Sequence, residues 1–331
     1  MAPKQNEQQL PGTDLLLKDL PEEPARFIRK MDCVAVERAA QIPSSADWFR
    51  EVKWDGYRVC VIKEGKSVAL RTKSNLPPSA RFKHIEDALA ASALPDCVLD
   101  AELVALDTEE RPVFQLLQQS RRNRAKVVIY VFDLLNFSGR NVMKLPLSVR
   151  RAALDALAPR FPDYVRLSET LPEDTPIPKL MAALDEHRLE GIVVKRKDST
   201  YREGKEPGTW VKHRLYEVGE FIIGGYLKRN DPYFDALIVG EMRGPQLHYK
   251  EKVRFGFDDE KKRNLLARME ALRMPVTPFE NLPERRRRGA LDAKQMAEAV
   301  WVKPQLHCTV EYTEKTQSGN IRGHGRFGEL L

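Results

Sequence analysis

The segment Glu51-Val52-Lys53-Trp54-Asp55-Gly56-Tyr57-Arg58, continued by VCVIKEG up to residue 65, sets the pattern for the first two thirds of the chain. Short apolar stretches alternate with turn residues, which predicts strands rather than one long helix. Similar stretches follow at SVALRT (67–72), CVLDAELVALD (97–107), VVIYVFDLL (127–135) and EGIVVKR (190–196). Between them, residues 150–157 and 179–189 carry apolar residues at helical spacing. The combination predicts an α+β domain with mixed or antiparallel sheets.

A second series of apolar stretches begins after WVKHR (210–214). It comprises GEFIIGGYL (219–227), DALIVGEM (235–242), QLHYKEKVRFGF (246–257) and CTVEYTE (308–314), with a helix expected at 258–272. Short strands with one helix in a segment of this length predict a small β-barrel of the oligonucleotide-binding (OB) type. Residues 1–24 are rich in Gln, Pro and Glu and show no sustained period. We therefore expect a flexible segment at 1–24, an α+β domain at 25–216 and an OB-fold domain at 217–331.

Length and composition agree with two domains. The 331 residues exceed a typical single domain, and 42% hydrophobic content is enough for a core in each part. Lys plus Arg outnumber Asp plus Glu by 55 to 48, and the net charge of +7 suits a polyanionic partner. The cysteines lie far apart, so neither a zinc site nor a disulfide framework is indicated. The polar N-terminus lacks an apolar run for a signal peptide or membrane span, and we expect a cytoplasmic protein.

Lys53 is the first candidate catalytic residue along the chain. A lysine at the end of an apolar strand is expensive to bury, yet desolvation and neighbouring cations lower a lysine pKa and yield a nucleophilic amine. Gly56 would let the backbone approach a ligand, Arg58 would hold a phosphate or ribose oxygen, and Glu51 would accept hydrogen bonds from a base. The K-x-D-G pattern alone also fits a surface turn with alternating charges. Other residues of the chain are therefore needed to distinguish a catalytic lysine from a surface turn.

Further polar residues lie at the ends of apolar strands, namely Glu102, Glu190, Lys195 and Lys212. Charged residues are rarely buried without a partner, so their positions in apolar stretches indicate a shared site. Two carboxylates and three lysines in one cleft would bind a divalent metal and a triphosphate. This combination predicts a nucleotide-binding site.

Taken in chain order, the segments that carry these residues resemble the motifs of the covalent nucleotidyltransferase superfamily. They are most similar to the ATP-dependent DNA ligase module of bacterial non-homologous end-joining ligases. EVKWDGYR resembles the nucleophile motif of that family, LDAEL its ribose-contacting glutamate motif, YVFDLL its adenine-stacking motif, and EGIVVKR and WVKHR its metal and phosphate motifs. FIIGGY and WVKPQLHCTVEYTE resemble the barrel of the same ligases. The resemblance runs from about residue 48 to residue 322.

The resemblance implies a DNA ligase that works through a covalent lysyl-AMP intermediate. Lys53 would attack the α-phosphate of ATP and expel pyrophosphate. The AMP would then pass to the 5′-phosphate of a break, and the 3′-hydroxyl would displace it and seal the strand. Either Mg²⁺ or Mn²⁺ would serve, because both accept carboxylate and water ligands.

The same resemblance assigns roles to the other strand-end residues. Glu102 would contact the ribose and Phe132 would stack on adenine. Glu190, together with Glu102, would organise the metal. Lys195 and Lys212 would stabilise charge on the transferring phosphoryl group. For Phe132 a second interpretation stays open, because an aromatic residue in an apolar strand is also a normal core residue.

Two motifs depart from the family pattern. Where the family commonly has T-R-N-G, this chain has RTKSN at 71–75, so either Arg71 or Lys73 takes the role of the arginine. Arg58 and Arg71 would lie near the ribose or the phosphates. The second lysine of the phosphate motif is replaced by Arg214, which still binds phosphate but is not equivalent to lysine.

The C-terminal motif is also altered. The family pattern R-H-P-x-F-K-G becomes IRGHGRFG at 321–328. Arg322, Arg326 or both would orient the pyrophosphate in the first step.

The expected partner is nicked or broken duplex DNA, bound largely without base readout. The basic runs at 121–124 and 285–288 would follow the DNA backbone and make binding salt-dependent. From the length of 331 residues we expect no polymerase or phosphoesterase domain like those of the larger end-joining proteins. We expect a monomer in the bacterial cytoplasm that acts alone or with separate end-joining or repair proteins.

Two other classes of function remain as alternatives. An RNA ligase or a GTP-using capping nucleotidyltransferase would share Lys53, Glu102, Glu190 and Lys212, but the barrel resemblance argues against both. A non-catalytic nucleic-acid-binding relic would gain nothing from burying Lys53 and Glu190. Comparing ATP with GTP, and nicked DNA with nicked RNA, separates these alternatives.

Overall fold

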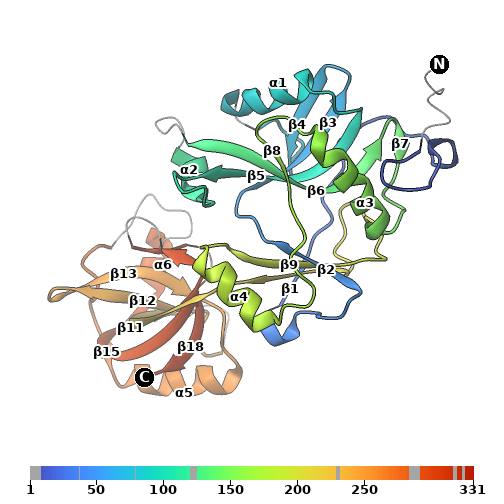
Figure 1. Cartoon of the computed structure of the whole chain (residues 1–331). Helices are drawn as coiled ribbons and strands as arrows, with labels where there is room; N and C mark the ends of the chain where they lie inside the picture. Colours follow the sequence, from blue (N-terminus) through green and yellow to red (C-terminus); the bar gives the residue numbers. More distant parts are fainter. Residues whose placement is uncertain are drawn as a thin grey trace. The chain divides into compact units, whose positions relative to one another are not determined.

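The computed structural model describes residues 9–36, 38–78, 80–119, 125–228, 232–282, 291–315, 319–322 and 325–331. The chain divides into two compact units, Met1–Leu215 and Tyr216–Leu331 (Figure 1). The division falls one residue before the expected domain boundary at 216/217. No helix in the described part of the chain is both long and apolar enough to span a membrane.

The larger sheet of the first unit has the strand order β4-β3-β5-β6-β7, with β8 parallel to β6. The strands are β3 (Tyr57–Glu64), β4 (Ser67–Thr72), β5 (Cys97–Leu106), β6 (Lys126–Phe137), β7 (Arg140–Asn141) and β8 (Val165–Leu167). Successive residues of β5 face opposite sides of the sheet. Leu99, Ala101 and Leu103 join the main core, whereas Val98 belongs to a second cluster. Asp100 and Glu102 therefore share the side of Val98, away from the main core.

Helices α1 and α3 lie along this larger sheet in Figure 1, and their apolar residues belong to its main core. The helices of the unit are α1 (Lys83–Ala91), α2 (Phe114–Gln119), α3 (Leu147–Leu157) and α4 (Ile177–Glu186), and the short 3₁₀ turns are η2 (Leu17–Asp19), η3 (Ala39–Gln41), η4 (Ala80–Phe82) and η5 (Ala158–Arg160). The helices predicted at 150–157 and 179–189 thus correspond to α3 and α4.

A smaller sheet has the order β1-β10-β9-β2 and packs against α4. Its strands are β1 (Val34–Ala35), β2 (Trp48–Val52), β9 (Gly191–Arg196) and β10 (Trp210–Arg214). Strand β9 pairs antiparallel with both β2 and β10. The segments that carry Glu51, Lys195 and Lys212 are thereby brought side by side.

The N-terminal segment differs from the prediction of a flexible lead-in. Leu10, Leu17 and Leu20 are buried in the core of the larger sheet. The backbone N–H of Leu10 donates to the carbonyl of Leu15 at 2.8 Å. The described residues 9–24 are therefore part of the folded unit. Their irregular leucine spacing supplies apolar surface without forming a helix or strand long enough to show a period.

The second unit is a small barrel. Its elements are β11 (Glu217–Leu227), β12 (Ala236–Arg243), β13 (Gln246–Val253), α5 (Asp259–Glu270), β14 (Arg273–Met274), α6 (Ala293–Glu298), β15 (Ala299–Tyr312), β16 (Glu314–Lys315), β17 (Ile321–Arg322) and β18 (Arg326–Leu330). The sheet runs β13-β12-β11-β15-β14, and β18 also pairs with β15. A bridge between Phe255, just after β13, and Arg326 in β18 closes the ring. The prediction of an α+β domain followed by an OB-type barrel is confirmed.

Candidate active site

A cavity of about 410 Å³ lies within the first unit, lined by residues of both sheets and of the loop that joins them. A volume of this size is typical of small-molecule sites. The predicted site residues among its lining are Glu51, Lys53, Arg58, Glu102, Phe132, Glu190, Lys195, Lys212 and Arg214. Arg71 is not part of this lining, whereas its neighbours Thr72 and Lys73 are.

Lys53 follows β2, and its position depends on two glycines. Its backbone N–H donates to the carbonyl of Gly191 at 2.9 Å, and a Cβ at Gly191 would lie 2.1 Å from the carbonyl oxygen of His213. A Cβ at Gly56 would lie 2.1 Å from the carbonyl oxygen of Leu103. Any larger side chain at either position would push the backbone away from the strand behind it. These glycines let the Lys53 loop run close to β5 and β10.

Glu190 connects Lys53 to Arg214. The Lys53 Nζ donates to Glu190 Oε2 in a close ion pair, and both side chains are about one seventh exposed. The Arg214 Nε donates to the other oxygen of Glu190 at 2.6 Å. One carboxylate thus holds the candidate nucleophile and a phosphate-binding candidate on the cavity wall.

Glu51 and Lys195 form a buried ion pair on the cavity wall. The Lys195 Nζ donates to Glu51 Oε2 at 2.8 Å, and the two side chains are 2% and 3% exposed. The other oxygen, Glu51 Oε1, is buried without a hydrogen-bond partner, and Arg151 Nη1 lies 3.7 Å from it. Lys195 was predicted to act on phosphate, and the structure places it beside Glu51 instead.

Phe132 reaches the cavity because of a β-bulge. Asp100 pairs with Asp133 and Ala101 pairs with Val131, so Phe132 is an extra residue in β6. Val131 and Asp133 are buried, whereas Phe132 is partly exposed and lines the cavity. Bulges commonly redirect a side chain beside a functional site. Phe132 is therefore more than a core aromatic, although it still packs against the cluster around Val98.

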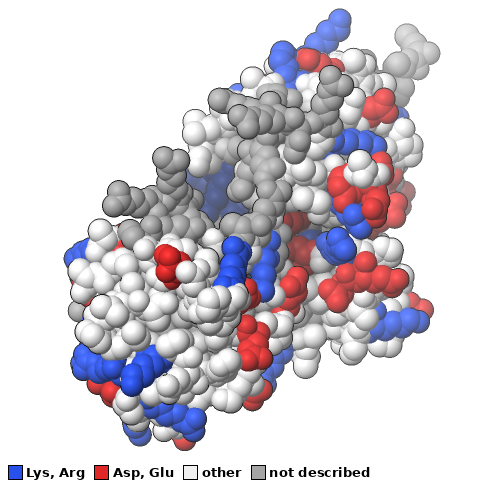
Figure 2. All heavy atoms as spheres, turned by 90° about the vertical axis from the view of Figure 1, so that its left-hand side faces the viewer, with Lys and Arg blue, Asp and Glu red and all other residues white. Residues whose placement is uncertain are grey.

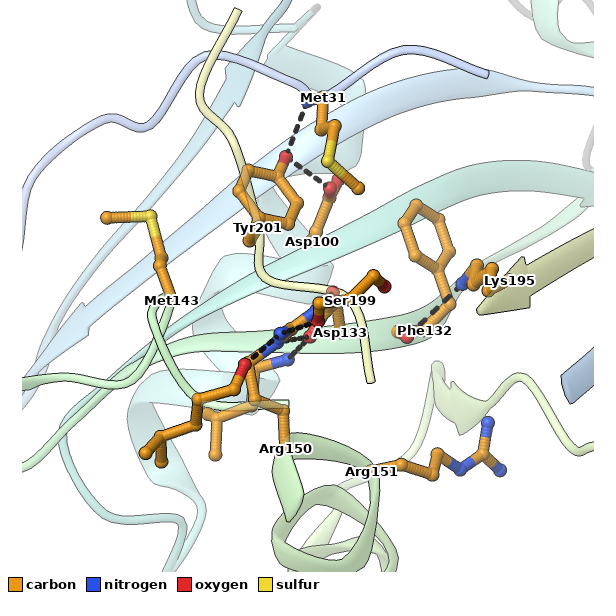
Figure 3. A network of polar contacts seen from close by, with 12 residues as sticks. Met31, Asp100, Phe132, Asp133, Met143, Arg150, Arg151, Lys195, Ser199 and Tyr201 are labelled. Carbon is orange, nitrogen blue, oxygen red and sulfur yellow. Dashed lines mark hydrogen bonds and ion pairs between the residues drawn. The ribbon is translucent and has the colours of Figure 1, made fainter. Parts of the chain in front are cut away.

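Arg58 is held by a carboxylate that sequence analysis missed (Figure 3 shows this carboxylate, Asp100, beside Tyr201). The guanidinium donates to both oxygens of Asp100 and to the carbonyl of Met31. The Tyr201 hydroxyl donates to Asp100 at 2.7 Å and accepts from the Met31 N–H at 2.9 Å. Although burial opposes it, Asp100 raises the pKa of Arg58 well above its usual value. The signal for Asp100 was its place two residues before Glu102 on the same side of β5.

Burial raises the pKa of Glu102 to about 8, although Lys53 and Arg58 oppose the shift. Glu190 and Asp100 raise the pKa further because they are like charges. No group of three or more His, Cys, Asp and Glu side chains positioned to hold a metal occurs within the described ranges. Mg²⁺ at nucleotide sites typically takes one or two carboxylates together with phosphates and water. Glu102 and Glu190 fit that pattern.

Lys212 shares an acidic neighbour with Lys30. Asp32 Oδ2 lies 3.1 Å from the Lys30 Nζ, and its Oδ1 lies 3.7 Å from the Lys212 Nζ. Although burial opposes it, Lys30 and Lys212 lower the pKa of Asp32. All three residues line the cavity. Asp32 and Lys30 precede the first long strand in an irregular segment, where the sequence gives no periodic signal.

The predicted residues of the C-terminal motif belong to the barrel unit. Arg326 lies in β18, and its Nε is 3.8 Å from Glu311 Oε2 on β15. The backbone of Arg322 lies in β17, but its side chain lies outside the described residues. So do the basic runs at 121–124 and 285–288. On the face drawn in Figure 2, Lys and Arg side chains occur in several groups with Asp and Glu side chains among them.

The fold and site together define a class of protein. The first unit brings lysines, arginines, carboxylates and aromatic rings to one cavity, which suits a nucleotide with its phosphates. The second unit is a barrel of the type that binds nucleic acid. A nucleotide-using enzyme that acts on nucleic acid is the class that combines these features.

Comparison with known families identifies the particular family. The family described as "ATP dependent DNA ligase domain" matches residues 30–214, and "ATP dependent DNA ligase C terminal region" matches residues 230–330. The chain belongs to the ATP-dependent DNA ligase family. The resemblance inferred from the motifs is confirmed.

Individual relatives agree with this assignment. The multifunctional non-homologous end joining protein LigD of Pseudomonas aeruginosa is 35% identical over 301 residues, which cover 87% of this chain and 34% of that protein. LigD of Mycolicibacterium smegmatis is 30% identical, covering 91% of this chain and 38% of that protein. A solved structure of a mycobacterial DNA ligase D complexed with ATP and MES is 28% identical, with a TM-score of 0.53 and coverage of 92% and 95%. The chain thus spans about a third of the length of these curated relatives.

Proposed function

We propose that this chain is an ATP-dependent DNA ligase that seals 5′-phosphate/3′-hydroxyl breaks in duplex DNA through a lysyl-AMP intermediate at Lys53. The observation that carries the proposal is the Lys53–Glu190 ion pair on the wall of a nucleotide-sized cavity. Family membership and the ATP-bound mycobacterial relative support the choice of nucleotide.

In the first step, Lys53 forms a bond to the α-phosphorus of ATP. The bond between the α-phosphorus and the bridging oxygen breaks, and pyrophosphate leaves with the electron pair. Lys53 attacks as the neutral amine, after one proton of its ammonium group has passed to Glu190, which already accepts a hydrogen bond from it. A second proton is released from the nitrogen to water as the phosphorus–nitrogen bond forms. The product is AMP joined to Lys53 through a phosphorus–nitrogen bond.

In the second step, a 5′-phosphate oxygen of the DNA attacks the AMP phosphorus, and the phosphorus–nitrogen bond to Lys53 breaks. The nitrogen takes up the proton held by Glu190 as it leaves, so the lysine is regenerated, and the DNA end carries AMP. In the third step, the 3′-hydroxyl attacks the 5′-phosphorus and loses its proton to water, while the bond from that phosphorus to the AMP oxygen breaks and AMP leaves. The strand is then continuous, and the net reaction consumes one ATP.

The base and ribose of the nucleotide would lie at the end of the cavity formed by Glu51, Phe132 and Glu102. Phe132 offers a ring redirected by a bulge for stacking on adenine. The unpaired Oε1 of Glu51 is a buried acceptor for an N–H of the base. Glu102 is proposed to contact the ribose.

The phosphates would lie near Lys53, Lys212 and Arg214. Lys212 and Arg214 supply positive charge where negative charge develops, which is the dominant contribution in phosphoryl transfer. Glu102 and Glu190 would hold Mg²⁺ or Mn²⁺ through water. When bound, the ion neutralises phosphate charge and polarises the phosphoryl oxygens.

We propose supporting roles for the remaining predicted site residues. Arg58 is proposed to act mainly through its contact with Asp100, because its guanidinium is already engaged there. Arg71 would act near the ribose or phosphates only after rearrangement, since Lys73 lies on the cavity wall and Arg71 does not. Arg322 and Arg326 are proposed to orient pyrophosphate.

The DNA partner and the cellular setting belong to the same proposal. We propose a monomer in the bacterial cytoplasm that binds nicked or broken duplex DNA. The relatives named for non-homologous end joining favour a role with separate repair proteins.

The proposal is tested by sealing assays on matched substrates. We expect joining of a 5′-phosphate nick in duplex DNA with ATP and a divalent metal, and little joining with GTP or with nicked RNA. Lys53→Ala should abolish this joining yet still seal a nick that already carries AMP, whereas Lys66→Ala, at an exposed turn, should behave as wild type. Equal loss on both substrates would make Lys53 structural, and activity only with GTP would favour a capping enzyme.

A further inference from the structure

Lys195 is enclosed in a way that does not suit contact with phosphate. Its side chain is 2% exposed although it forms part of the cavity wall. Its ammonium nitrogen lies 4.4 Å from the centre of the Phe132 ring and 4.3 Å from that of Trp210. Both rings attract the cation by their electron-rich faces. The Nζ also donates to the carbonyl of Phe132 at 3.4 Å, as Figure 3 shows.

The strongest partner of Lys195 is one oxygen of Glu51. Glu51 Oε2 accepts from the Lys195 Nζ at 2.8 Å and from the Ser168 hydroxyl at 3.4 Å. Glu51 Oε1 has Arg151 at 3.7 Å but accepts no hydrogen bond. The carboxylate is therefore fixed through Oε2, and Oε1 is left as a buried acceptor. A buried acceptor without a partner is unfavourable until a ligand supplies a donor.

A second set of contacts fixes the same carboxylate from the side of the nucleophile loop. The Trp54 Nε1–H donates to the Ser168 hydroxyl at 3.0 Å, and that hydroxyl donates to Glu51. The Trp54 ring stacks on Tyr130 with 3.5 Å between ring centres. Since Trp54 follows Lys53 directly, the orientation of Glu51 and that of the nucleophile loop share one hydrogen-bonded chain.

We propose that Lys195 is a positioning residue for base recognition. It acts through Glu51, which it orients so that Oε1 accepts an N–H from the 6-amino group of the purine, and it does not act on the phosphates. The Ser168 hydroxyl assists from the other side. The inference rests on the proposed use of ATP. It predicts that Lys195 governs the choice of base, whereas Lys212 governs the rate with any base.

The test compares ATP with the triphosphate of purine riboside, which has hydrogen in place of the 6-amino group. The rate of protein adenylylation, or of the matching purine-nucleotide transfer, is measured at subsaturating nucleotide for each variant. Glu51→Gln and Lys195→Met should each reduce the preference for ATP about ten- to a hundredfold, the range of a hydrogen bond to a charged group. Ser168→Ala should reduce it in the same direction.

A double variant separates an indirect role from a direct one. If Lys195 acts through Glu51, Lys195→Met should reduce the preference no further in the Glu51→Gln background. This pair also removes both buried charges together, so it remains informative if Lys195→Met alone does not fold. Lys212→Met should lower the transfer rate with both nucleotides and leave the preference for ATP unchanged.

Two results would overturn the inference. One is a Lys195→Met protein that reacts more slowly with both nucleotides by the same factor and keeps the wild-type preference for ATP. That result would place Lys195 at the phosphates. The other is an additive further loss of preference in the double variant, which would make its action independent of Glu51. Absence of labelling of the wild-type protein by ATP would instead reject the proposed function itself.

Discussion

Replacing Asp133 with asparagine removes the carboxylate from an ion pair directly behind the bulge that carries Phe132. The Arg150 Nε and Nη2 each donate to Asp133 at 2.8 Å, and both side chains are 0% exposed. Arg150 also donates to the carbonyl of Ser199 (Figure 3). It donates to the carbonyl of Leu145 as well. The pair thus joins β6, α3 and the segment that leads to Tyr201.

The size of the effect follows from this burial. Removing one partner of a buried pair leaves an uncompensated charge and costs about 3–5 kcal/mol. The carbonyls of Leu145 and Ser199 still accept from Arg150, so we expect a loss of about 3 kcal/mol in the free energy of unfolding, at the low end of this range. For a unit of 215 residues, each kcal/mol lowers the unfolding midpoint by roughly 2–4 °C, which gives a decrease of about 6–12 °C.

Thermal and urea unfolding of Asp133→Asn would measure the change. The matched control is Asp87→Asn, whose partner Lys83 lies on an exposed helix surface, and it should leave the midpoint unchanged. Asp133→Leu combined with Arg150→Met should recover most of the stability, because neither charge remains buried. A free energy of unfolding for Asp133→Asn within about 1 kcal/mol of the wild-type value would refute the reasoning, since the carbonyls alone would then satisfy Arg150.

Two further predictions concern the carboxylates of the cavity. Glu190→Gln should slow adenylylation about 100-fold or more, because Lys53 loses its charged partner, and a burst rate equal to wild type would remove Glu190 from the mechanism. The pKa of Glu102 is raised to about 8, above its value in the unfolded chain, so its contribution favours the folded state at low pH and is lost as pH rises through about 8. The unfolding midpoint of ligand-free protein should therefore fall more between pH 6 and pH 9 for wild type than for Glu102→Gln, and parallel curves would contradict the shift.

The residues that could be predicted from sequence are those whose local pattern already conflicts with burial. Lys53, Glu102 and Glu190 interrupt apolar strands, and an unpaired charge in such a strand is tolerated only where a partner or ligand meets it. The α+β and barrel folds were predictable for a related reason, since strand length and turn residues are local properties.

Other parts of the site depend on contacts between distant segments. The Glu51–Lys195 pair arises from the register of β2 on β9, which no local pattern encodes. The bulge at Phe132 arises because β6 has one more residue than β5 between two paired positions, and this pairing is set only when the two strands meet in the fold. The stacking of Trp54 on Tyr130 likewise requires the fold. The phosphate role of Lys195 was implied by the family resemblance and stays a prediction, whereas the contacts of Lys195 with Glu51 are the basis of the different role proposed above.

The central claim is that Lys53 becomes covalently joined to AMP. Incubation of the purified protein with α-labelled ATP and Mg²⁺, followed by denaturing electrophoresis and a chase with nicked duplex DNA, tests it directly. We predict a labelled protein band that is absent in Lys53→Ala and disappears when nicked duplex is added. A band that persists in Lys53→Ala, or no band with ATP in the wild-type protein, would contradict the claim.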